Sequence, residues 1–77
     1  MDYDEEKVDD CTLALMFLVI HKGQYATRAW KGFDWDTLDR LHEKGLISDP
    51  KSKARSVVLT EEGERRSREL FEELFGE

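Results

Sequence analysis

The sequence has little of what stabilises secreted proteins or anchors membrane proteins. It holds a single cysteine, Cys11, so no disulfide can form within the chain, and a reducing cytoplasm is the expected compartment. Its first residues are acidic, whereas a secretory signal begins with basic residues. Residues 13–20 are continuously apolar, but a helix that spans a bilayer needs about 20 such residues. We therefore expect a cytoplasmic protein with no membrane contact.

Residue patterns for catalysis or cofactor binding are also scarce. No glycine-rich phosphate loop is present, and the one cysteine and two histidines lack the spacing of metal ligands. Asp34, Asp36 and Asp39 lie close in sequence, but a helix cap and a solvated helix face account for them better than an acid–base cluster. We expect no enzyme activity, no metal and no cofactor.

Length and charge indicate one acidic domain. The chain has 77 residues, and we expect residues 1–77 to form a single domain. Its formal net charge of −6 argues against a protein that coats nucleic acid. The charge is uneven, because residues 1–10 and 34–50 are acidic. The basic residues form two clusters in sequence: Lys22, Arg28 and Lys31, and then Lys51, Lys53 and Arg55.

The N-terminal half predicts one long helix with two apolar stripes. Asp4 suits its N-cap and Gly23 its end, so we expect a helix to about Lys22. An ordinary surface helix has one apolar stripe, so both sides of this helix need a cover. Cys11 is expected as a small core residue. The two stripes are Val8, Cys11, Leu15 and Leu18, and Leu13, Met16, Phe17 and Ile20.

Residues 27–31 predict a second, short helix that Gly32 closes. Trp30, Phe33 and Trp35 follow one another closely. They suit a partner-binding surface, because Trp is enriched at interface hot spots. A domain this small is nevertheless expected to use its large rings in the core.

The second half has clear start and stop signals. Asp34 suits the N-cap of a helix that runs to Lys44, and Gly45 suits the left-handed end of a Schellman motif. A strand from Ile47, a break at Asp49–Pro50 and the β-branched run over residues 55–59 predict a two-stranded wing.

A last helix follows the wing. Thr60 suits its N-cap, and the helix is expected to end near Gly76. Gly63 lies inside this helix, where Gly costs ~1 kcal/mol relative to Ala, so we expect the wing or the first helix to approach it closely. The helix carries one apolar stripe: Leu70, Phe71, Leu74 and Phe75.

The order of these elements resembles winged-helix transcription regulators of the multiple-antibiotic-resistance and phenolic-acid-decarboxylase repressor types. Residues 41–47 (LHEKGLI) and 58–63 (VLTEEG) carry the resemblance. It implies a mostly α fold with a small two-stranded β wing, winged helix-turn-helix-like. The apolar stripes of the first and last helices exceed what one small domain can easily bury, so we expect a symmetric homodimer built mainly from these two helices, as such regulators often form. The departure lies in residues 34–44, which show Asp36, Asp39 and Glu43 where the regulators show basic or amide side chains to DNA.

The whole chain is also similar to a family of short bacterial proteins known only as a domain of unknown function. Residues 27–35 (TRAWKGFDW) and 49–53 (DPKSK) carry this similarity. It brings no activity with it.

Three functions remain open. The leading one is a winged-helix-like module that acts through self-association or another protein. A DNA-binding regulator, described below, is the second. The third is an acidic module that competes with nucleic acid for a basic partner. The residues expected at a self-association surface are Leu13, Phe17, Ile20, Leu70, Phe71, Leu74 and Phe75. The alternative is a DNA-binding transcriptional regulator that uses the wing (residues 48–58) and a helix-turn-helix (residues 27–44). Its expected backbone contacts are Arg28, Lys31, Lys51, Lys53 and Arg55.

Overall fold

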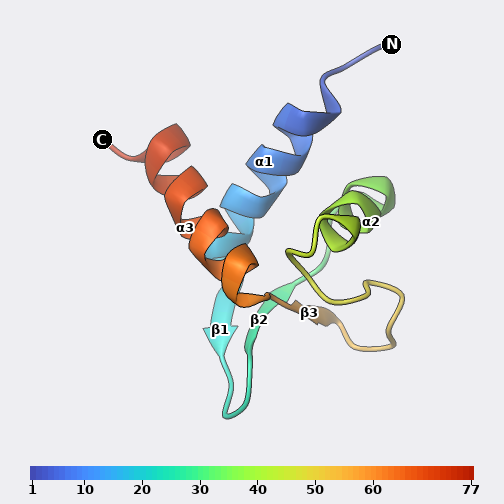
Figure 1. Cartoon of the computed structure of the whole chain (residues 1–77), viewed down its shortest axis with the longest axis vertical. Helices are drawn as coiled ribbons and strands as arrows, with labels where there is room; N and C mark the ends of the chain where they lie inside the picture. The colour runs from blue at the N-terminus through green and yellow to red at the C-terminus, as the bar shows by residue number, and fades with distance from the viewer.

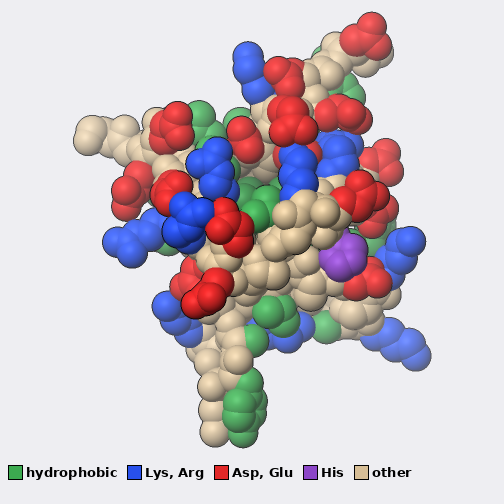
Figure 2. Space-filling model, viewed as in Figure 1, with side chains coloured by type: hydrophobic (Ala, Val, Ile, Leu, Met, Phe, Trp, Pro, Cys, Tyr) green, Lys and Arg blue, Asp and Glu red, His purple; other side chains and the backbone are tan.

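The computed structural model describes residues 1–77 as three helices and a three-stranded antiparallel sheet. In Figure 1 the helices α1 and α3 form a V, and the β1–β2 hairpin lies at the end opposite both termini. In Figure 2 most Asp and Glu side chains lie over the helices, interspersed with Lys and Arg, whereas the tip of the hairpin shows hydrophobic and other side chains. The elements are α1 (Glu5–Met16), the 3-10 turn η1 (Phe17–Val19), β1 (Ile20–Lys22), β2 (Thr27–Trp30), α2 (Trp35–Glu43), β3 (Ser56–Val58) and α3 (Glu61–Phe75).

The first helix is shorter than the sequence predicts. Asp4 caps it as expected, since its carboxylate accepts a hydrogen bond from the Lys7 amide. The helix ends at Met16, however, and residues 17–22 form η1 and β1. The prediction of a helix to Lys22 is wrong because Val19 and Ile20 are β-branched and because β2 offers a pairing partner to residues 20–22.

Residues 27–30 form a strand, and the prediction of a short helix there is wrong. This strand, β2, lies in the middle of the sheet, and Ala29 stands opposite both Ile20 and Val57. Pairing on both edges outweighs a weak local preference for helix. Residues 27–44 are therefore a strand, a turn and a helix, and the predicted helix-turn-helix is also wrong. The fold is mixed α and β, with more sheet than a two-stranded wing.

The helix α2 has the predicted boundaries. The Asp34 carboxylate accepts hydrogen bonds from the Thr37 amide at 3.1 Å and the Thr37 hydroxyl at 3.0 Å. Gly45 has a φ of +75°. The Leu46 amide donates to the Leu41 carbonyl at 3.1 Å, which closes the expected Schellman motif.

The two segments predicted to form the wing pair with each other at only two positions. Ile47 bridges Leu59, and the Ser48 amide donates to the Val58 carbonyl at 2.8 Å. Residues 49–55 form a loop, which we call the wing loop. Thr60 then caps α3, as expected, by accepting a hydrogen bond from the Gly63 amide at 2.9 Å.

The core forms where the helices meet one face of the sheet. Only one of the two stripes of α1 enters it, through Leu13 and Met16. Cys11 lies on the other stripe and is exposed, so its prediction as a core residue is wrong. The buried apolar residues are Leu13, Ala14, Met16, Ala29, Leu38, Leu41, Ile47, Val57, Leu59 and Leu70.

Candidate functional site

An exposed apolar surface runs along the contact between α1, η1 and α3. The Phe17 ring lies 5.1 Å from the Phe71 ring, and Phe71 lies 5.5 Å from Phe75, between ring centroids. Leu18 is 65% exposed and Leu74 is 45% exposed, which is unusual for large apolar side chains on a small domain. We call the apolar residues with exposed surface on α1, η1 and α3 together the apolar seam: Leu15, Phe17, Leu18, Phe71, Leu74 and Phe75.

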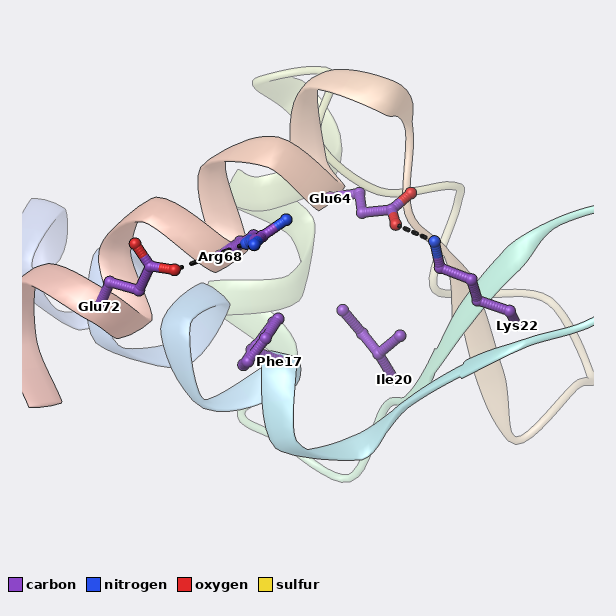
Figure 3. Close-up of a pocket in the computed structure, with 6 residues that line it drawn as sticks. All are labelled: Phe17, Ile20, Lys22, Glu64, Arg68 and Glu72. Carbon is purple, nitrogen blue, oxygen red and sulfur yellow. Dashed lines mark ion pairs between the residues drawn. The ribbon is translucent and has the colours of Figure 1, made fainter. Parts of the chain in front are cut away.

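A hollow of about 270 Å³ opens at one side of the seam, between β1 and α3. Phe17 and Ile20 form its apolar floor, and Figure 3 shows both side chains directed toward it from the segment that follows α1. Charged side chains surround the floor in two ion pairs: Lys22–Glu64 at 3.0 Å and Arg68–Glu72 at 3.5 Å.

Glu64 is held firmly in this hollow. Its carboxylate accepts hydrogen bonds from the Lys22 ammonium and from the Thr27 hydroxyl, the latter at 3.1 Å. These two hydrogen bonds lower the pKa of Glu64 below its ordinary value and outweigh the opposing effect of burial. The ionised Glu64 therefore ties α3 to both strands of the hairpin.

Of the residues predicted to form a self-association surface, some are buried in the core and others are exposed. Leu13 and Leu70 are only 1% and 3% exposed, so their assignment to a surface is wrong, because they fill the core between the helices and the sheet. Phe17, Ile20, Phe71, Leu74 and Phe75 keep exposed surface. Leu15 and Leu18 are also exposed, and they belong to the other apolar stripe that the sequence identified.

The basic residues assigned to nucleic-acid contacts have different roles. Lys51, Lys53 and Arg55 are exposed in and beside the wing loop. Arg28 extends across the sheet to Ser56, whose hydroxyl accepts from Arg28 Nε at 2.7 Å. The Lys31 ammonium donates to two carbonyls of the wing loop, so this residue holds the loop in place.

The tryptophans are not in the core. Trp30 and Trp35 are 55% and 57% exposed, so the expectation of a core cluster is wrong for both. Phe33 is partly buried and packs against the core. The reason lies in the strand β2, where alternation directs Ala29 inward and Trp30 outward.

A buried acidic residue, Asp9, was missed. It is 1% exposed and accepts hydrogen bonds from Arg40 Nε and Lys44 Nζ, each at 2.8 Å. Burial alone would lower the pKa of Lys44, but hydrogen bonds to Asp9 and Glu6 outweigh it and raise that pKa. The cluster ties α1 to α2 and is structural. Its signal was present, because Asp9 shares a helix face with Leu13 and Met16.

No helix of the structure has the length and apolar character needed to cross a bilayer.

Comparisons with known proteins place the chain in a family without assigning it an activity. No solved structure matches the chain. The uncharacterized protein y4hR of Sinorhizobium fredii (strain NBRC 101917 / NGR234) is 59% identical over 75 residues, which cover 97% of each chain. A family model matches residues 4–77, and the chain therefore belongs to the family described as a domain of unknown function (DUF6429).

Proposed function

We propose that this protein is a non-enzymatic, winged-helix-like binding module that self-associates through the apolar seam. One observation carries the proposal: Leu13 and Met16 of one apolar stripe are buried in the core, whereas Cys11, Leu15 and Leu18 of the other stripe are exposed. Leu15 and Leu18 on the second stripe are 41% and 65% exposed. A second copy of the chain would bury this surface, and burial contributes a favourable free energy of about 25 cal/mol for each Å² of apolar area.

The charges beside the seam favour a second copy as the partner. Along α3 a cationic segment, residues 65–68, precedes an acidic segment, residues 69–73. Within one copy these arginines pair with glutamates of the same helix, so a second copy would share or exchange these pairs. In a twofold-symmetric pair with antiparallel α3 helices, the cationic segment of each copy faces the acidic segment of the other. The same surface thus complements itself in charge as well as in apolar character.

The small size of the domain gives self-association a further benefit. A single core in a chain of this length supplies only ~3–5 kcal/mol of stability. Burial of the seam in a dimer would add stability that depends on protein concentration.

Sedimentation equilibrium on matched variants tests the proposal. We expect the wild-type protein to be a dimer at high micromolar concentration and Leu18→Asp to be a monomer there. Tyr25→Asp is the control, because Tyr25 is 91% exposed in the turn of the hairpin and lies outside the seam. A wild-type monomer at high micromolar concentration contradicts the proposal.

Cys11 offers a second measurement on the same surface. Its thiol is exposed and lies on the uncovered stripe of α1. Modification by a thiol reagent should therefore be fast in dilute protein and slow as concentration rises. In Leu18→Asp the rate should stay fast at all concentrations.

The alternative of a DNA-binding regulator keeps only part of its expected surface. The exposed cations of the wing loop favour it, since they suit contacts to a phosphate backbone. The helix that would enter the major groove is α2, which exposes Asp36 and Glu43. Carboxylates in that position repel phosphates, and this makes self-association the stronger proposal.

A further inference from the structure

The cations of this acidic protein are concentrated at the sheet. Residues 11–33 and 50–60 contain six of the twelve Lys and Arg and none of the eighteen Asp and Glu. All three strands lie within these two segments. Lys22 pairs with Glu64, and the remaining five cations form no ion pair: Arg28, Lys31, Lys51, Lys53 and Arg55. The middle strand, the residue that follows it and the wing loop therefore carry positive charge that no ion pair compensates.

One face of the sheet is not used by the core. Ala29 and Val57 are buried together with the core residues of α1 and α3. Because side chains alternate along a strand, the neighbours of these two residues point to the opposite face. We call this the outer sheet face, and it consists of His21, Arg28, Trp30, Ser56 and Val58.

Trp30 forms a supported aromatic surface on this face. Its indole lies against Gly32, where any side chain would collide with the ring. The centroid of the Phe33 ring lies 6.3 Å away. The indole is thus held in place on one side, while 55% of the residue stays exposed to solvent. A ring fixed in this way can stack with another flat ring without first losing its own freedom.

Arg28 is also held in place beside Trp30. Its Nε donates to the Ser56 hydroxyl at 2.7 Å, and its Nη2 donates to the Ser56 carbonyl at 3.3 Å. Ser56 is the residue that stands opposite Trp30 in the sheet. The Nη1 group of Arg28 has no hydrogen-bond partner in the protein and remains available to an anion.

The wing loop brings more cations to the same end of the sheet. The Lys31 amide donates to the Arg55 carbonyl at 3.2 Å, next to the Trp30–Ser56 pair. The Lys31 ammonium donates to the Pro50 and Ser52 carbonyls, each at 2.7 Å. These bonds fix the loop, which carries Lys51, Lys53 and Arg55. The loop also carries one carboxylate, that of Asp49, which accepts a hydrogen bond from the Lys51 amide at 2.9 Å.

We propose that the outer sheet face and the wing loop bind a single-stranded nucleic acid. Trp30 stacks on a base, while Arg28 and the cations of the wing loop contact phosphates. Stacking platforms beside a basic groove are the usual means by which proteins hold single strands. In a duplex the bases stack on one another, so their faces are not open to the indole. The carboxylates of an acidic peptide have no ring that stacks on it. This site is separate from the apolar seam, so it does not rest on self-association.

Fluorescence anisotropy with short labelled oligothymidylate and oligouridylate tests the proposal at physiological salt. Trp30→Ala should weaken binding by about 5- to 150-fold, the usual effect of removing one stacking ring. Trp30→Phe should retain most of the affinity, which separates stacking from damage to the fold. Tyr25→Ala is the control for the loss of an exposed ring, because Tyr25 lies in the hairpin turn, outside the outer sheet face and the wing loop, and it should change the affinity little.

Salt and competitors provide the remaining comparisons. Arg28→Ala should lower the slope of log affinity against log salt by about 0.7, the value for one phosphate contact to a single strand. The Leu18→Asp variant should bind as the wild-type protein does. The proposal is overturned by an absence of binding, by equal effects of Trp30→Ala and Tyr25→Ala, or by equal competition from a duplex. Equal competition from polyglutamate would also overturn it and would indicate an acidic protein as the partner.

Discussion

The carbonyl group of Leu46 lies against the Cα atom of Gly63, in the space that a side chain at position 63 would occupy. The same carbonyl accepts a hydrogen bond from the Thr60 amide at 3.1 Å. The end of the α2 turn is thereby packed directly on the first turn of α3. The close approach that the sequence predicted at Gly63 is confirmed, although the neighbour is the residue that leads into the wing.

Gly63→Ala should therefore destabilise the protein. Ala in a helix gains ~1 kcal/mol over Gly, but the added methyl group meets backbone atoms that cannot turn aside. Forced overpacking typically costs about 1–3 kcal/mol, and the range of about 2–3 kcal/mol applies here because the contact is with backbone, so we expect a net loss of about 1–2 kcal/mol. Thermal denaturation should show a lower Tm, whereas Glu73→Ala on the exposed side of α3 should leave it nearly unchanged. A raised Tm in Gly63→Ala would contradict the packing at this position.

Leu41→Ala should unfold much of the protein at room temperature. Leu41 is fully buried in the core, and truncation of a buried Leu costs about 2–5 kcal/mol. A small domain has a total stability of only about 5 kcal/mol, so little would remain. Circular dichroism during urea denaturation measures the loss. An unchanged denaturation curve would show that α2 does not pack as described.

Asp9→Ala should destabilise the protein more than Asp10→Ala. Asp9 is buried and holds Arg40 and Lys44, whereas Asp10 has no ion pair. Loss of one partner from a buried pair costs about 3–5 kcal/mol, and the lower end applies because both cations keep contact with water. Denaturation in urea compares the two variants. Equal stabilities would mean that the cluster does not join α1 to α2.

Glu64 should contribute stability that depends on pH. Its pKa in the folded protein is lowered from the ordinary value of 4.5, chiefly by the hydrogen bond from Lys22. The contribution is present above pH 4.5 and is lost as the pH falls through the lower, folded-state pKa. Glu64 is partly exposed, so we expect Glu64→Gln to cost no more than about 1 kcal/mol at pH 7. The wild-type protein should be more stable than Glu64→Gln at pH 7, and this difference should disappear in acid. A difference that stays the same at both pH values would contradict this role.

Local chemistry predicted the second half of the fold well. Asp34, Gly45 and Thr60 form the caps that their residue types favour, because each cap depends on a few neighbouring backbone groups. The hairpin was missed for a different reason. Residues 13–20 are apolar throughout, and an apolar run of this kind does not distinguish a helix from a buried strand. The pairing of residues 20–22 with residues 27–29 decides the outcome, and that pairing is a contact between separate segments.

The candidate surfaces were predictable to a similar degree. The basic clusters and the apolar stripes were visible in the sequence. The exposure of Trp30 could not be predicted, because it follows from the alternation of side chains along β2, and residues 27–31 were predicted to be a helix. The burial of Leu13 and Leu70 likewise depended on which face of each helix meets the sheet.

The separation of the acidic helices from the carboxylate-free sheet means that net charge describes this protein poorly at physiological salt. The molecule extends 38 Å along its longest axis, with the hairpin at one end and the termini at the other (Figure 1). The screening length is ~8 Å at physiological ionic strength and ~30 Å in dilute buffer. At physiological salt a polyanion at the wing loop therefore interacts chiefly with the charges of the loop itself, which are three cations and Asp49. In dilute buffer it also interacts with the carboxylates of the helices. Lowering the salt should strengthen such binding less than it would for a uniformly basic protein.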